Sequence, residues 1–88
     1  MNIDFRKSFE KDLNNIRDEA LLKKIKAVIE EVQNTENLAD ISNIKKVQAD
    51  GNYYHVRIGD YRVGIAVSES IVIFVRVLYR KDVYRYFP

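Results

Sequence analysis

The sequence predicts an α+β domain in which two N-terminal helices pack on a mostly antiparallel sheet, in the order β-α-α-β-β-β with an optional short C-terminal helix. Two observations predict this class. Apolar residues recur at helical spacing up to about residue 35, and from residue 53 onward β-branched and aromatic residues predominate, as they do in strands. The chain has 88 residues, no repeat and no linker-like stretch, so residues 1–88 are expected to form a single domain.

The N-terminal half predicts a short strand followed by two helices. Residues 2–5 alternate polar and apolar side chains, which predicts the strand. A first helix is expected at 6–17, on an apolar stripe formed by Phe5, Phe9, Leu13 and Ile16. Asp18 can cap a second helix that ends near Thr35. Its stripe is expected to face the core and consists of Leu21, Leu22, Ile25, Val28, Ile29 and Val32.

The C-terminal half predicts a connector and an antiparallel sheet. Between 38 and 47 an apolar residue recurs at every third position, which predicts a helical turn or connector that presents Lys45 and Lys46. Strands are expected at 53–58, 61–67 and 71–79. Gly59 and Asp60 fit a two-residue hairpin turn, and residues 68–70 fit a three-residue one.

Composition restricts the classes of function. A hydrophobic content of 47% with 32% charged residues is typical of a folded domain. Without cysteine and with one histidine, the chain cannot form a disulfide, a thiolate site or a histidine-rich zinc cluster, so neither a metal nor a cofactor is expected. The longest apolar run, residues 71–75, is too short to span a bilayer, and the N-terminal residues show no apolar signal core. We therefore expect a cytoplasmic protein without a membrane partner.

Charge is distributed unevenly along the chain. Residues 1–44 carry 7 Lys/Arg against 9 Asp/Glu, whereas residues 45–88 carry 8 against 4. The second half is thus the electropositive one. Scattered solvating charges could produce this count, but a polyanion would bind to this half of the molecule.

The predicted turns place three arginines side by side. They put Arg57 opposite Arg62 and Arg62 opposite Arg76, a set that we call the predicted arginine row. The same face is expected to carry His55, Gly64, Ala66, Phe74 and Leu78. The core face is expected to carry Val56, Ile58, Tyr61, Val63, Ile65, Ile73, Val75 and Val77.

Like charges directly opposite each other destabilise a sheet by about 0.2–1 kcal/mol, so the predicted arginine row needs an anion. An acid of the chain could supply it, and the candidates are Glu10, Asp12 and Asp82. The alternative is an external phosphate diester, which guanidinium groups bind in a two-pronged manner. Small side chains at Gly64 and Ala66 would leave room for such a ligand.

A histidine and an aromatic tail accompany the arginines. His55 is either an ordinary buried or surface residue or a general acid or base next to Arg57. Residues 80–87 form a short helix or an irregular tail that interleaves cations with aromatic rings, an arrangement that suits unpaired RNA bases. Phe87 is expected to pin this segment to the core. For Tyr84 and Tyr86, packing and base stacking both stay open.

Three segments together resemble the RelE/ParE superfamily of bacterial toxin–antitoxin modules: "IGDYRVGI" at 58–65, "YRKDVYRYF" at 79–87 and "LADISNIKKV" at 38–47. The resemblance covers essentially the whole chain. It implies a toxin that is neutralised by an antitoxin wrapped around it and that reaches operator DNA only through this antitoxin. RelE-like members cut messenger RNA in the ribosomal decoding site.

The resemblance also implies a chemistry in which a ribose 2′-hydroxyl attacks the adjacent phosphate without a metal. The site residues that it implies are His55, Arg57 and Arg62, with Arg80 or Lys81 at the leaving oxygen and with His55 or a C-terminal tyrosine, Tyr84 or Tyr86, handling the proton. This sequence has histidine and arginine where lysines are typical of RelE. Further RNA contacts are expected from Lys45, Lys46, Arg76 and Arg85.

Three functions are thus compatible with the sequence. The first is a ribosome-dependent endoribonuclease that inhibits translation. The second is a ParE-like inhibitor of DNA gyrase that is not an enzyme, because a shared fold does not fix the target. The third is a degenerate module that only binds its antitoxin and operator DNA. The combination of His55, Arg57 and Arg62 favours the nuclease.

Overall fold

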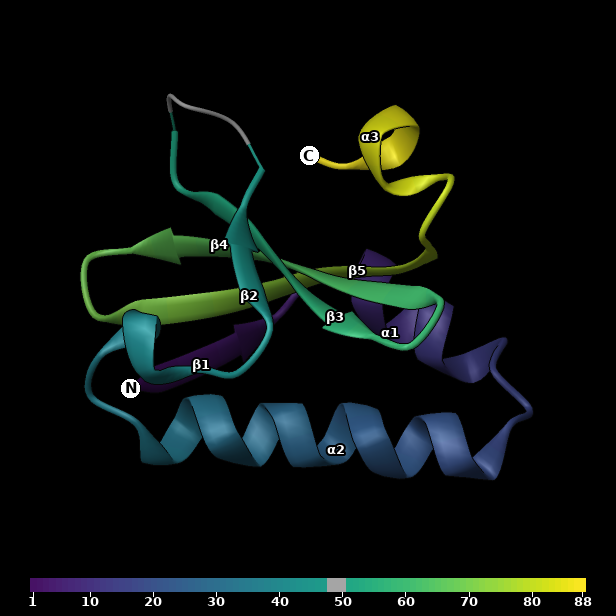
Figure 1. Cartoon of the computed structure of the whole chain (residues 1–88), viewed down its shortest axis with the longest axis horizontal. Coiled ribbons are helices and arrows are strands. Elements are labelled where there is room, and N and C mark those ends of the chain that lie inside the picture. Colours follow the sequence, from purple (N-terminus) through teal and green to yellow (C-terminus); the bar gives the residue numbers. More distant parts are fainter. Residues whose placement is uncertain (48–50) are drawn as a thin grey trace.

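The computed structural model describes residues 1–47 and 51–88, which form a five-stranded sheet with helices on both faces (Figure 1). The strands lie in the order β1 (Asn2–Phe5), β5 (Ile71–Tyr79), β4 (Tyr61–Ser68), β3 (Tyr53–Ile58) and β2 (Ile44–Lys46). β1 runs parallel to β5, and every other neighbouring pair is antiparallel. The α+β class with a mostly antiparallel sheet is confirmed.

The two N-terminal helices cover one face of the sheet. Helix α1 (Lys7–Asn14) packs on β5, and helix α2 (Glu19–Asn34) crosses the sheet below β3 and β1 (Figure 1). The backbone N–H groups of Ala20 and Leu21 donate to Asp18 Oδ1 at 3.0 and 3.2 Å. These bonds satisfy donors that the first helical turn leaves without a partner, so the predicted cap is confirmed.

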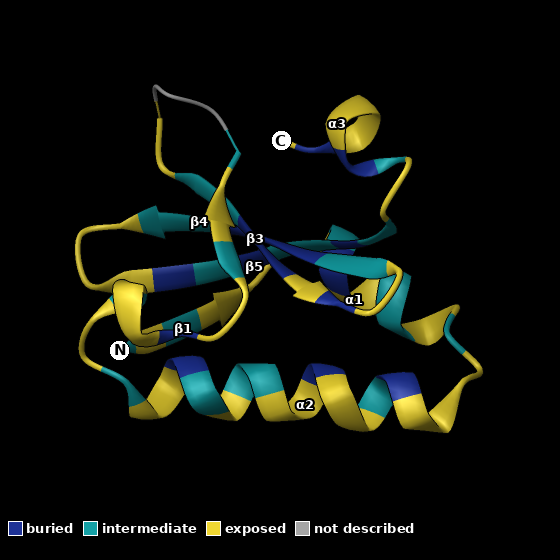
Figure 2. Cartoon of the chain, viewed as in Figure 1, coloured by how far each residue is buried: buried dark blue, intermediate teal, exposed yellow. Residues whose placement is uncertain are grey.

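The core lies between these helices and the sheet. The sheet-facing side of α2 is buried and its outer side is exposed (Figure 2). At the α1 end, the rings of Phe5, Phe9 and Phe74 contact one another, with centroids 5.4–5.7 Å apart. The buried core residues are Phe9, Leu21, Ile25, Val32, Ile41, Val56, Ile58, Val63, Ile65, Val72, Phe74 and Val77.

The segment from 38 to 47 is only partly the predicted connector. A 3₁₀ turn, η1 (Leu38–Asp40), is followed by edge strand β2, which pairs antiparallel with β3. The prediction missed this strand, because three residues are too few to show an alternating pattern. β2 places Lys45 directly opposite His55.

The predicted register of β4 and β5 is wrong by two residues. Ser68 pairs with Ile71, so this turn has two residues rather than three, and Glu69 takes a positive φ of 54°. A bulge between Gly64 and Ile65 shifts the pairing by one further residue, which brings the error to two residues. The first hairpin is as predicted, with Arg57 opposite Arg62.

The register shift changes which side chains face the core. Between the turn and the bulge each β5 residue points the opposite way from the prediction, so Phe74 is buried in the core rather than beside the arginines. Ile73 and Val75 lie half-buried outside it. Beyond the bulge the predicted faces return, and Val77 is in the core as expected.

The C-terminal segment forms a short helix, α3 (Val83–Tyr86), on the sheet face opposite α2 (Figure 1). Of the two forms predicted for residues 80–87, the helix is therefore the one observed. Within the described residues, no helix has the length and apolar character needed to cross a bilayer. These residues also contain no group of three or more metal-ligating side chains.

Candidate functional site: a cation-lined cleft

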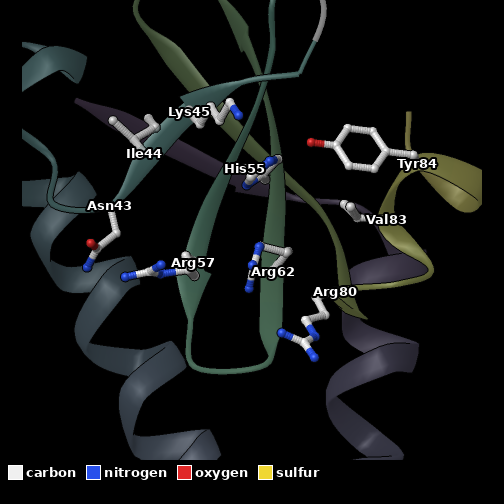
Figure 3. A pocket seen from close by; sticks show the side chains of 9 residues that line it. All are labelled: Asn43, Ile44, Lys45, His55, Arg57, Arg62, Arg80, Val83 and Tyr84. Atoms are coloured by element: carbon white, nitrogen blue, oxygen red, sulfur yellow. The ribbon is translucent and has the colours of Figure 1, made fainter.

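A cleft of about 420 Å³ opens on the sheet face that α2 leaves uncovered. Strands β2, β3 and β4 form its floor, and α3 stands at its edge (Figure 3). Among the described residues that line it, four are cationic and none is acidic. The lining residues are Asn43, Ile44, Lys45, His55, Arg57, Arg62, Arg80, Val83 and Tyr84. An uncompensated group of cations in a concave surface attracts anions.

The β3–β4 hairpin fixes two of these cations. Arg57 and Arg62 are cross-strand neighbours at the end of the hairpin. Arg62 Nη1 donates to the carbonyl oxygens of Gly59 at 3.0 Å and Tyr61 at 2.9 Å, so its guanidinium is held in place with other N–H groups left over. The side chain of Arg57 is exposed and has no acidic partner among the described residues. The pair therefore contributes two guanidiniums to the same cleft.

Arg80 joins them from the end of β5. Its backbone N–H donates to the carbonyl oxygen of Asp60 at 2.7 Å, which ties the residue after β5 to the turn between β3 and β4. The side chain of Arg80 is exposed and lies at the lower mouth of the cleft, beside Arg62 (Figure 3). Arginines from three segments of the chain thus line one cleft.

His55 lies deeper in the cleft and is 6% exposed. Neither ring nitrogen, Nδ1 or Nε2, has a hydrogen-bond partner among the residues that the structure describes. Burial, followed by the positive charges of Arg62 and Lys45, lowers the pKa of His55 below 6.5. Near neutral pH its imidazole is therefore uncharged, with one nitrogen free to accept a proton. Buried polar atoms without partners are rare outside functional sites.

Tyr84 contacts this histidine from helix α3. Its ring meets that of His55 edge to face, with centroids 6.3 Å apart and planes at 83°. The tyrosine is 67% exposed, and its hydroxyl points back toward the floor of the cleft (Figure 3). A ligand on the arginines would thus lie next to a neutral imidazole and a phenol.

The cleft brings together six of the predicted site residues: Lys45, His55, Arg57, Arg62, Arg80 and Tyr84. The other predicted residues do not line it. Lys46 projects from β2, Lys81 lies over the ring of Tyr79, and Arg85 lies over the ring of Tyr86. These side chains are exposed, and the roles assigned to them stay predictions.

Arg76 does not extend the arginine pair. It lies opposite Gly64, while Arg62 lies opposite Leu78, so the predicted arginine row of three is wrong. Arg76 Nε donates to Asp12 Oδ2 at 2.8 Å, and the backbone N–H of Val77 donates to the same carboxylate at 2.9 Å. The anion that pairs with Arg76 is therefore an acid of the chain itself, and Asp12 is one of the three acids that were candidates from the sequence.

Sequence reasoning also missed part of the cleft. Asn43 and Ile44 line it because of the unpredicted strand β2, and Val83 lines it from α3. The space that Gly64 was expected to leave for a ligand is filled by the ring of Phe87. Phe87 is buried, as expected, but it packs on the cleft side of the sheet rather than in the main core.

Known proteins are similar to this chain in sequence and in fold. The family described as "ParE toxin of type II toxin-antitoxin system, parDE" matches residues 3–84. Toxin RelE3 of Methanocaldococcus jannaschii is 46% identical over 89 residues, which cover 100% of both chains. A chain of the RelB-RelE antitoxin-toxin complex from Methanococcus jannaschii superposes with a TM-score of 0.80 at 45% identity, covering 97% of this chain and 99% of that one.

More distant structures share the fold alone. The archaeal RelE-RelB complex from Pyrococcus horikoshii contains a chain with a TM-score of 0.73 at 18% identity, and the match covers 90% of this chain and 93% of that one. For YafQ from E. coli the TM-score is 0.67 at 17% identity, with 94% and 97% covered.

The fold and the cleft define a class of small α+β domains whose open sheet face carries a pair of opposed arginines beside a buried histidine. The sequence relatives complete the identification. The chain belongs to the RelE/ParE superfamily of toxins from type II toxin–antitoxin systems.

Proposed function

We propose that this toxin is an endoribonuclease that cuts messenger RNA on the ribosome and thereby inhibits translation. The observation that carries the proposal is the cleft, where four cations without an acid surround a histidine whose pKa is lowered. A phosphate diester supplies the missing negative charge, and a neutral imidazole is the form of histidine that can accept a proton. The open, shallow cleft fits a single RNA strand held in place by a larger partner.

In the proposed reaction, the arginine pair binds the scissile phosphate. Arg62 is already oriented by two carbonyl groups, so its remaining N–H donors need little rearrangement as negative charge grows on the phosphate oxygens. Arg57 approaches from the neighbouring strand. Planar guanidiniums can each bind phosphate oxygens through two N–H groups.

Proton transfer completes the scheme. The ribose 2′-hydroxyl gives its proton to the neutral imidazole of His55 and forms a bond to phosphorus, while the bond from phosphorus to the 5′ oxygen breaks. The products are a 2′,3′-cyclic phosphate and a 5′-hydroxyl. Arg80 stabilises the leaving oxygen, which takes a proton from the Tyr84 hydroxyl or from water.

The proposal includes partners. Because a relative of 45% identity is described in a RelB-RelE antitoxin–toxin complex, we propose that a cognate antitoxin neutralises this chain and provides its link to operator DNA. The ribosome and messenger RNA are the proposed targets, and they imply that the toxin acts in the cytoplasm. Lys46, Lys81, Arg85 and Tyr86 would then contact RNA outside the cleft.

The proposal is tested with programmed ribosomes. Purified toxin is added to ribosomes carrying a defined messenger, and cuts are mapped by primer extension. Wild-type protein should give site-specific cuts that depend on ribosomes. Arg62→Ala should reduce the rate by about 10²–10³-fold, as loss of a charge-stabilising donor does elsewhere. Lys26→Ala, an exposed change on α2 away from the cleft, should keep the wild-type rate.

The second candidate is a gyrase inhibitor, which the match to the ParE family favours. Intact messenger in the presence of folded wild-type toxin would contradict the nuclease proposal. Inhibition of gyrase supercoiling by the same preparation would then support the ParE-like function.

A further inference from the structure

The C-terminal segment is seated in a notch that exists because residue 64 is glycine. Gly64 lies opposite His55 on β3 and opposite Arg76 on β5, next to the bulge. A Cβ at this position would lie 2.8 Å from Cδ1 and Cε1 of Phe87, closer than van der Waals contact permits. The ring of Phe87 therefore occupies the space above the glycine, where it is 2% exposed.

This contact fixes α3 beside the cleft. Tyr53 meets the ring of Phe87 edge to face at 5.6 Å, and the backbone N–H of Phe87 donates to the carbonyl oxygen of Val83 at 2.9 Å. Val83 is itself buried. Between these two anchors lies Tyr84, which is largely exposed and so has little packing of its own to hold it over His55.

We propose that Phe87, seated on Gly64, is a positioning residue that holds Tyr84 over His55 and keeps water away from the imidazole. This inference rests on the proposed nuclease function only for its effect on catalysis. The seat itself is a property of the folded chain. Phe87 acts through Tyr84 and His55, and it is not among the residues that line the cleft.

The pKa of His55 can be used to measure whether the ring of Phe87 lies on Gly64, because the charged groups around the imidazole are known. Lys45 on β2, Arg57 on β3, Arg62 on β4 and Arg80 after β5 line the same cleft, and Tyr84 faces the ring from α3. Removing only the ring of Phe87 changes none of these four positive charges, whereas Tyr84 loses the support that holds it at His55. The loss of burial then raises the pKa of His55, while the nearby positive charges still hold it below the ordinary value.

The experiment compares variants from both sides of the contact. Phe87→Ala empties the seat, Gly64→Ala fills it with a methyl group, and Phe87→Leu keeps an apolar side chain there. Phe5→Ala is the matched control, because it removes a 40% exposed phenylalanine at the far edge of the sheet. Circular dichroism verifies folding. Nuclear magnetic resonance measures the pKa of His55 and the contact between the rings of His55 and Tyr84.

We expect Phe87→Ala and Gly64→Ala to raise the pKa of His55 and to abolish its contact with Tyr84. The effect of the double variant should equal that of either single one, since both remove the same contact. At saturating toxin, the single-turnover cleavage rate on ribosomes should fall by about 10²-fold, the scale expected for a misplaced catalytic group. Phe87→Leu should restore most of both quantities, and Phe5→Ala should change neither.

Folded Phe87→Ala and Gly64→Ala proteins with the wild-type pKa and ring contact would overturn the inference. Unchanged cleavage in a variant whose ring contact is lost would also overturn it. If wild-type protein cleaves no messenger but the variants still shift the pKa and lose the contact, the seat stands and the proposed function fails.

Discussion

His55 is the side chain for which folding creates the most unusual environment. The imidazole is buried, its nitrogens have no hydrogen-bond partner within residues 1–47 and 51–88, and two cations are close. The folded chain therefore binds a proton at His55 less readily than the unfolded chain, whose histidine titrates near its ordinary pKa of 6.5. Stability and ionisation are thereby linked at this residue.

The link predicts the pH dependence of stability. As pH falls below 6.5, the histidine binds a proton in the unfolded chain but not in the folded chain, because folding lowers its pKa. The free energy of unfolding therefore decreases. Well above pH 6.5 the histidine is neutral in both the folded and the unfolded chain, so it does not make the free energy of unfolding depend on pH. Urea unfolding between pH 5 and 8 measures the effect, with His55→Gln as control. The wild-type curve should fall more steeply toward acid than the variant curve, and parallel curves would contradict the prediction.

Asp12 is the acid whose removal should cost most stability. Its carboxylate accepts from the Arg76 side chain and from the backbone N–H of Val77, and its side chain is 15% exposed. Asp12→Ala leaves both donors unsatisfied and should lower the free energy of unfolding by about 1–3 kcal/mol. Lys11→Ala, an exposed neighbour on the same helix, should change it by less than about 0.5 kcal/mol. Equal losses in urea unfolding would exclude this role.

At the scale of elements, the two hairpins use the same kind of turn with different residues. Gly59 begins the turn between β3 and β4 with φ 56°, and Glu69 begins the turn between β4 and β5 with φ 54°. Two-residue turns with positive φ at the first central position favour glycine there. The second turn therefore stores strain that the first does not.

Substitutions at the first residue of each turn should change the stability of the protein in opposite directions. Glu69→Gly relieves the strain and should stabilise the protein by up to about 1 kcal/mol, less the added freedom of the unfolded chain. Gly59→Ala introduces the same strain and should destabilise it by about 1 kcal/mol. Thermal unfolding followed by circular dichroism checks both, and changes of the same sign would refute the account.

The elements show what the sequence could predict. Both long helices and four of the five described strands follow from periodicity, and Asp18 marks the start of α2. The register of β4 and β5 did not follow, because a positive φ at Glu69 and the bulge at Gly64 are backbone states that the residue pattern does not encode. Because the predicted register was wrong by two residues, it placed Arg76 opposite Arg62, whereas Arg76 lies opposite Gly64.

At the scale of the whole molecule, the two sheet faces have different tasks. One face is covered by α1 and α2 and holds the core, and the other carries the cleft (Figures 1 and 3). The sequence predicted the opposed pair Arg57 and Arg62 and the nearby His55, since a tight turn fixes their neighbours. It also predicted Lys45 as a site residue, but it could not predict that Lys45 lies opposite His55, because this pairing depends on an edge strand of three residues.

The clustering of charge predicts how the proposed binding of RNA depends on salt. Each cation that contacts phosphate in a single strand adds about 0.7 to the slope of log K against log salt. Arg62→Gln should lower the slope by about this amount, whereas Lys26→Gln on α2 should leave it unchanged. The measurement is a fluorescence titration of a 2′-deoxy-substituted oligonucleotide, which cannot be cleaved. Equal slopes for both variants would mean that the cleft is not the binding surface.

The parallel pairing of β1 with β5 affects when the molecule can assemble. Asn2 meets Ile71, so the sheet closes a loop of about 70 residues, which is slow and cannot begin until β5 has been synthesised. The cleft also takes Arg80 and Tyr84 from the segment that follows β5. A nascent chain thus has no complete cleft while most of it is still being translated. Under the proposed function, late assembly would keep the toxin inactive until its own translation is nearly complete.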